Sequence, residues 1–150
     1  MRAILQELRE NVYCVKGTVK ILRVVQWAML ASIVLYAGAG EILGRTPGGA
    51  NPSESYAFST IAVAIVGVIF VVRRTLVLPS AESLAAHPDD GLSLQHWKNG
   101  YLATYILCEV LALFGLVLRC TGFGFQHSLP FYVGGFVLLF FFGPREPVSS

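Results

Sequence analysis

Long apolar blocks dominate this sequence and restrict what the chain can fold into. They occupy residues 24–40, 56–72, 100–118 and 130–143, and the charged residues gather between them. The first three have the roughly 17–25 residues that a helix needs to cross a hydrocarbon core of about 30 Å. Charged residues make up 13% of the chain, against about 25% in a water-soluble domain. The sequence therefore predicts an all-α integral membrane protein.

The fourth block is the shortest, and it spans a bilayer only if residues 126–129 join its helix. We therefore expect four transmembrane helices, arranged as two antiparallel hairpins within a single membrane domain that covers residues 1–150. The expected spans are about 24–40, 56–72, 100–118 and 127–143.

The basic residues predict the orientation, because lysine and arginine are enriched in cytoplasmic segments beside the spans. Of the 11 lysines and arginines, only Arg45 and Arg119 would lie on the outer side. The others would share one side: Arg2, Arg9, Lys16, Lys20, Arg23, Arg73, Arg74, Lys98 and Arg145. We therefore expect both termini and a loop at 73–99 to be cytoplasmic, in a bacterial-type inner (plasma) membrane.

Residues 1–23 carry an apolar stripe at helical spacing, with lysine and arginine on the other faces. This pattern suits an N-terminal amphipathic cytoplasmic helix that lies on the anionic inner leaflet. A plain extension of the first span is the alternative. In the 73–99 loop, we expect Pro79 and Pro88 to interrupt the chain, residues 80–86 to form a short helix, and Asp90 to cap the third span.

Small and aromatic residues suggest how the spans pack. Small side chains let membrane helices approach closely, and they occur on one face of the second span and in the third and fourth. The candidates are Thr60, Ala64, Gly67, Ala112, Gly134 and Gly135. Trp97 and Tyr101 precede or begin the third span, where an interfacial aromatic belt is expected.

Glu109 lies in the middle of the third block, without a basic residue in any span interior. An ionised carboxylate at the bilayer centre costs about 2.5–3.5 kcal/mol on insertion scales. We therefore expect Glu109 to be protonated at rest, with its O–H group bonded to a neighbour. Tyr105, one turn earlier, is the local candidate partner. The polar candidates on other helices are Gln26, Ser32, Tyr36 and Thr60.

The stretch "CEVLALFGLVL" at residues 108–118 resembles the ion-binding helix of the proteolipid (subunit c) of V-type and related rotary ATPases. The matching residues are Glu109, Val110, Leu111, Leu113, Gly115 and Leu116. This resemblance implies four helices from a duplicated hairpin, with Glu109 as the carrier of the translocated ion. A second resemblance, to small multidrug-resistance exporters, rests on Tyr101, Leu102, Ile106, Leu107, Glu109 and Val110.

Three functions follow for this acid. The first is a membrane subunit that handles a proton or cation at Glu109 and Tyr105, as the proteolipid resemblance implies. The second is a proton-coupled small-molecule exporter that works as a dimer. The third is a non-transporting assembly subunit in which Glu109 only joins helices. In each case we expect the lipid bilayer and either copies of the chain or a larger membrane complex as partners.

Other chemistries find no support in the sequence, and we expect no enzyme activity, no cofactor and no metal. The three cysteines form no CxxC motif and are expected to be reduced: Cys14, Cys108 and Cys120. The polar residues of the 73–99 loop match no metal-site spacing: His87, Asp89, Asp90 and His96. His96 and His127 would lie at opposite boundaries, which excludes a haem held between them at midplane. The basic residues flank spans, so nucleic-acid binding is not expected.

Overall fold

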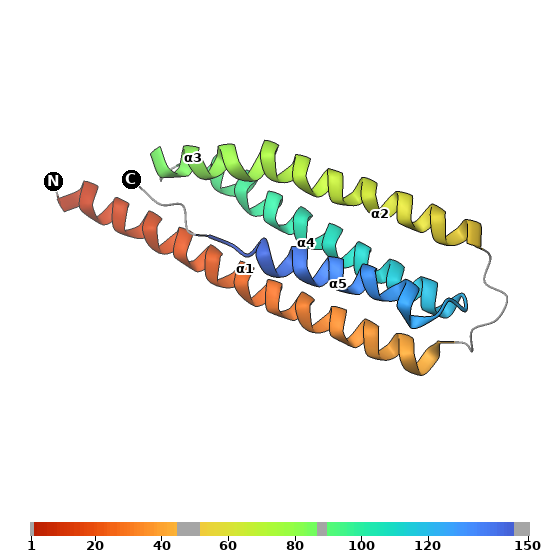
Figure 1. Cartoon of the computed structure of the whole chain (residues 1–150). Helices are drawn as coiled ribbons and strands as arrows, with labels where there is room; N and C mark the ends of the chain where they lie inside the picture. The colour runs from red at the N-terminus through yellow and green to blue at the C-terminus, as the bar shows by residue number, and fades with distance from the viewer. Residues whose placement is uncertain (1, 45–51, 87–89, 146–150) are drawn as a thin grey trace.

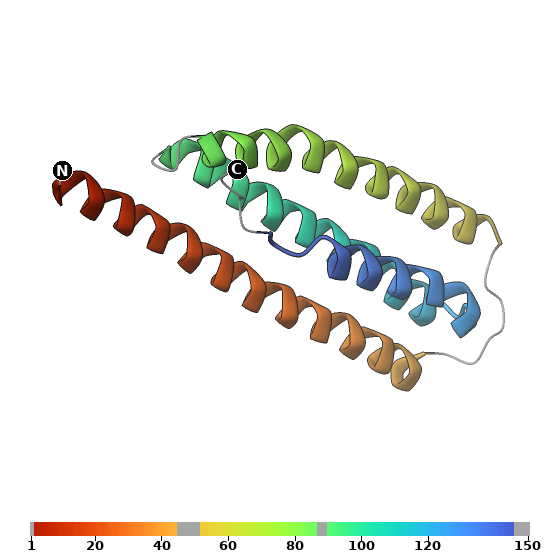
Figure 2. The ribbon, with the colours of Figure 1, turned by 60° about the vertical axis from the view of Figure 1, so that its left-hand side comes forward.

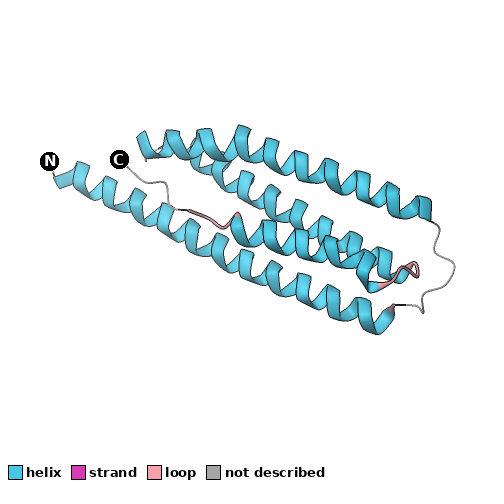
Figure 3. Cartoon of the chain, viewed as in Figure 1, coloured by secondary structure: helices cyan, strands magenta, loops and turns pink. Residues whose placement is uncertain are grey.

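The computed structural model describes residues 2–44, 52–86 and 90–145, and every regular element in these ranges is helical (Figure 3). The elements are α1 (Arg2–Leu43), α2 (Pro52–Val72), the π-helical turn η1 (Arg73–Val77), α3 (Leu78–Ala86), α4 (Gly91–Cys120) and α5 (Phe125–Phe141). Three helical stretches are long and apolar enough to cross a membrane, namely Lys16–Leu43, Tyr56–Ala86 and Gly91–Cys120. The all-α prediction is confirmed.

The fourth apolar block forms α5, which begins at Phe125. The helix therefore includes residues 126–129, which the block needs if it is to cross a bilayer. Its 17 residues give a helix of about 26 Å. This is slightly shorter than a typical hydrocarbon core of about 30 Å. Short helices of this kind are accommodated by an upright orientation or by local thinning of the bilayer.

Helix α4 lies at the centre of the bundle, with α1 and α2 on opposite sides (Figures 1 and 2). It packs along α5, α1 and α2, whereas α1 and α2 share no extended contact among the described residues. The prediction of two packed hairpins is therefore wrong for the first pair. The reason is that α4 buries side chains on several faces, including Tyr105, Cys108, Leu111 and Leu118, while α2 fully buries only Ile69 among its described side chains.

The most extensive helix contact joins α4 to α5. A Cβ atom at Gly135 would lie 2.8 Å from the Cys108 carbonyl oxygen and 3.2 Å from Ala112 Cβ. Farther along, the Tyr132 ring crosses Gly115, whose Cβ would lie 2.9 Å from the ring. The turn between the helices places Gly122 at φ +98°, and the Phe123 N–H donates to the Leu118 carbonyl at 3.1 Å. This is a Schellman ending, which glycine favours.

Most of the described chain at 73–99, the segment expected as a cytoplasmic loop, is helical. Helix α2 passes directly into η1 and then α3, so the predicted short helix at 80–86 is present but begins at Leu78. Pro79 lies just after η1, where the Leu78 N–H donates to the Arg73 carbonyl. A π-helical turn adds a residue and so relieves the clash of a proline ring with the preceding turn. Pro88 lies outside the described residues.

The π-helical turn η1 also brings its first residue into the bundle. The Arg73 guanidinium carbon lies 4.1 Å from the Phe142 ring centroid and 5.7 Å from that of Tyr101. These cation–π contacts hold a positive charge at this end of the bundle, where no ion pair to Arg73 is formed among the described residues. Val77 packs on Gly100 of α4, where a Cβ would lie only 2.7 Å from Val77 Cγ2.

Helix α1 is one continuous helix of 42 residues, so the expected separate amphipathic helix at 1–23 is wrong as an independent element. The chain follows the alternative, in which the arm extends the first span. Figure 1 shows this N-terminal part projecting past the other helices. Within residues 16–23, the side chains of Val19 and Leu22 are buried. They lie on the same face of α1 as the buried Leu30 and Ile33.

Trp97 and Tyr101 are buried in the bundle, with 0% and 3% of their surface exposed, so their expected place in a lipid-facing aromatic belt is wrong. Their ring centroids lie 4.9 Å apart in a T-shaped arrangement, and Tyr101 contacts Tyr105 in the same way. The three residues are four apart, and so they line one face of α4.

The predicted cap at the beginning of α4 is confirmed, because Asp90 accepts a hydrogen bond from the Leu92 N–H at 3.1 Å.

Orientation is tested by cysteine labelling. Cys120 is exposed at the end of α4, whereas Cys14 lies in α1, on the side that carries most of the basic residues. We expect a membrane-impermeant maleimide to modify Cys120 in intact cells and to reach Cys14 only after permeabilisation. Single-cysteine variants separate the two signals. Labelling of Cys14 alone in intact cells would reverse the predicted topology.

Candidate functional site

Glu109 lies in the middle of the apolar part of α4, about 14 Å of helix beyond Gly100. Its side chain is half-buried and points to α1, where Ser32 is the nearest hydrogen-bond partner. The Ser32 hydroxyl forms a short hydrogen bond with Glu109 Oε1. Tyr36, one turn farther along α1, also lies close enough to interact with the Glu109 carboxyl group.

The Ser32 hydroxyl has two oxygen neighbours, and its single hydrogen limits how both contacts can be satisfied. The Ser32 hydroxyl also lies 2.8 Å from the carbonyl oxygen of Met29. A serine hydroxyl carries one hydrogen and accepts through its lone pairs. If that hydrogen goes to Met29, the bond to Glu109 needs a proton from the carboxylic acid. A protonated Glu109 therefore satisfies both contacts, and an ionised one satisfies only one.

The second carboxyl oxygen has a different environment. Glu109 Oε2 is buried and accepts no hydrogen bond from the described part of the chain. Burying a carbonyl oxygen without a hydrogen bond costs far less free energy than burying an unpaired negative charge. An ionised Glu109 would therefore leave this oxygen without a hydrogen bond from the described part of the chain.

The sequence named five possible partners, and the structure brings two of them, Ser32 and Tyr36, to Glu109. Tyr105 is fully buried, but its hydroxyl has no partner among the described residues, so the expected bond to Glu109 is not formed. Gln26 donates to the Leu139 carbonyl of α5 at 2.8 Å. Thr60 donates to the Tyr56 carbonyl of its own helix at 2.9 Å.

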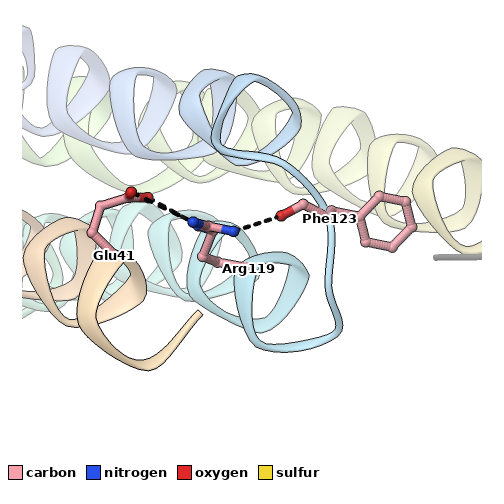
Figure 4. A network of polar contacts seen from close by, with 3 residues as sticks. All are labelled: Glu41, Arg119 and Phe123. Atoms are coloured by element: carbon pink, nitrogen blue, oxygen red, sulfur yellow. Dashed lines mark hydrogen bonds and ion pairs between the residues drawn. The ribbon is translucent and has the colours of Figure 1, made fainter. Parts of the chain in front are cut away.

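A polar network at one end of the bundle fixes α1 against α4 (Figure 4). Arg119 Nε donates to Glu41 at 2.9 Å, and its Nη1 donates to the Phe123 carbonyl at 3.2 Å. A Cβ at Gly40 or Gly44 would lie 3.4 Å or less from the Arg119 side chain, so both glycines make room for it. The sequence alone relates Arg119 only to the orientation of the chain. The network holds the helix pair that carries Ser32 and Glu109.

The predicted packing residues divide into two groups. Ala112, Gly134 and Gly135 lie at the contact between α4 and α5. The face of α2 that carries Thr60, Ala64 and Gly67 is exposed, and nothing lies within 4 Å of a Cβ at Gly67. This face does not pack within the described chain, because α2 turns its bulkier face inward. The inward residues are Phe58, Ala62, Ile65, Val66 and Ile69.

Metal-ligating side chains do not gather in the described residues, where no group of three or more histidine, cysteine, aspartate or glutamate residues could hold an ion. Asp90 is engaged in the cap of α4, and His87 and Asp89 lie outside the described residues. Cys108 is buried and Cys120 is exposed, and both are free thiols.

Comparisons with known proteins give no relative: no family model, no curated protein and no solved structure matches the chain.

Proposed function

We propose that this protein spans a membrane and that Glu109 binds and releases a proton in the bilayer interior. The observation that carries the proposal is the carboxyl group itself, with Oε1 bonded to Ser32 and Oε2 buried without a partner in the described chain. Acids at this depth are expensive and are associated with ion pathways and proton relays. The three long apolar helices support the membrane location.

The neighbouring groups favour a proton over a metal cation. Glu109 has two hydroxyl groups near it, from Ser32 and Tyr36. A hard cation such as Ca²⁺ takes 6–8 oxygen ligands, which this set does not provide. A proton needs only one acceptor and one hydroxyl relay. Because Glu109 is half-buried, a second copy of the chain or another subunit can reach it and complete a path.

The structural alternative is that the protonated acid only joins helices, and the Ser32 contact between α1 and α4 favours it. Interhelical hydrogen bonds of this kind are worth about 0.6–2 kcal/mol in membranes. The two functions differ in whether the proton leaves. An acid that only joins helices keeps its proton at every physiological pH, whereas a carrier exchanges it.

Carbodiimide labelling tests whether this proton exchanges. A hydrophobic carbodiimide attacks protonated carboxyl groups in apolar surroundings, so we expect it to modify Glu109 in membranes. For a carrier, labelling should fall as the pH is raised, and Glu41 provides the control because its carboxylate is half-exposed and paired with Arg119. Mass spectrometry of peptides locates the adduct. Labelling of Glu109 that is the same at all pH values would leave only the structural role.

A further inference from the structure

A cavity of about 420 Å³ lies where α1 passes the end of α5. Arg23 of α1 and Arg145, beyond the end of α5, both line it. Three of the seven other lining residues are aromatic, namely Trp27, Phe140 and Phe141. Its volume is within the range of small-molecule sites, and its lining combines two cations with apolar rings.

Neither arginine has an acidic partner within the described ranges, where the one ion pair joins Arg119 to Glu41. Three carbonyls near the end of α5, those of Leu138, Leu139 and Phe140, have donors other than the two arginines. Gln26 donates to the carbonyls of Leu139 and Phe140 at 2.8 and 3.4 Å, and the Phe142 N–H donates to that of Leu138 at 3.0 Å. Within the described ranges, the two positive charges of the cavity therefore have no carboxylate beside them and can receive an anionic ligand.

The cavity lies at the depth of lipid headgroups if the chain spans a bilayer. Arg23 immediately precedes the apolar block that begins at Val24. Trp27, one turn farther in, is 61% exposed, and Phe140 and Phe141 are 54% and 68% exposed. Aromatic residues at this level contact the upper acyl chains. The charged part of the lining thus faces the headgroup region, and the aromatic part faces hydrocarbon.

We propose that this cavity binds the phosphate of an anionic phospholipid, with Arg23 and Arg145 on the phosphate and the aromatic rings beside the acyl chains. Arginine matches phosphate geometry because its guanidinium presents parallel N–H donors. Basic pockets between membrane helices bind anionic headgroups in the same way. Inorganic phosphate would satisfy the arginines alone, whereas the aromatic wall suits a ligand with acyl chains. The assignment rests on the proposed membrane location and is independent of the proton at Glu109.

Tryptophan fluorescence tests this site, because the chain has two tryptophans and only Trp27 is exposed. The protein is placed in phosphatidylcholine vesicles that contain brominated phosphatidylglycerol or, at the same mole fraction, brominated phosphatidylcholine. Bromine quenches tryptophan by contact, and the Trp27→Phe variant gives the signal of Trp97 for subtraction. We expect each arginine to enrich the anionic lipid at Trp27 about fivefold.

Arg23→Gln and Arg145→Gln should each lower this enrichment. Lys20→Gln is the matched control, because Lys20 is an exposed cation one turn earlier on α1 and does not line the cavity. Equal quenching by the two brominated lipids, or an equal loss in Lys20→Gln, would overturn the site. If inorganic phosphate abolishes the additional quenching by the anionic lipid, and chloride at the same ionic strength does not, the ligand of the cavity is free phosphate and not a lipid. Absence of quenching by both lipids would refute the membrane location itself, and the lipid site with it.

Discussion

Glu109→Gln should remove the pH-dependent carboxylic-acid band from infrared difference spectra of the protein in bilayers. Glutamine keeps the length of the side chain, and its amide can donate to the Ser32 hydroxyl that Glu109 contacts. It cannot gain or lose a proton in the physiological range. In proteoliposomes with a pH gradient, proton movement that depends on the protein should fall to the level of empty liposomes, while helix content and insertion stay the same.

Two further variants separate proton exchange from helix packing. Glu41→Gln removes a half-exposed carboxylate that is paired with Arg119, and it should leave both the infrared band and the proton movement unchanged. Glu109→Leu should lose the band and also weaken the α1–α4 contact by about 0.6–2 kcal/mol. If Glu109→Gln retains the band or the proton movement of the wild type, the carrier role is wrong and the acid joins helices.

Gly135→Ala should destabilise the bundle by about 1–3 kcal/mol, the usual cost of overpacking a filled interior. The added Cβ would meet the Cys108 carbonyl oxygen at 2.8 Å and the Ala112 backbone nitrogen at 3.3 Å. These are backbone atoms of α4, so they move only if the two helices separate. Thermal unfolding in mild detergent, followed by circular dichroism, measures the loss.

Gly134→Ala is the matched control for this prediction. The nearest atom to its Cβ would be Leu111 Cδ2 at 3.5 Å, an ordinary van der Waals contact with the end of a flexible side chain. Alanine also has a higher helix propensity than glycine, so this variant should be as stable as the wild type or slightly more so. Equal destabilisation by the two substitutions would show that loss of a glycine, and not the close contact of α4 with α5, is responsible.

The packing of the apolar helices is only partly predictable from the sequence. Spans adjacent in sequence were expected to pack as hairpins, and α4 and α5 do so. The first pair does not, because the described α1 and α2 both pack against α4 and not against each other. Apolar blocks give the length and helical state of each span, but every face of such a helix is equally compatible with lipid and with protein. Which faces meet depends on the close fit of residues such as Gly135 and Ala112.

The sequence by itself determined the helical state of the apolar blocks, the cap at Asp90 and the singular position of Glu109, because these depend on local composition and spacing. Only the tertiary structure decided that Ser32, and not Tyr105, bonds to that acid. It also turned Trp97 and Tyr101 into the core and placed Arg23 and Arg145 in the lining of one cavity. These contacts join residues that are distant in sequence, and they follow from the rotation and depth of each helix against its neighbours. Neither quantity is encoded in the hydropathy of a single span.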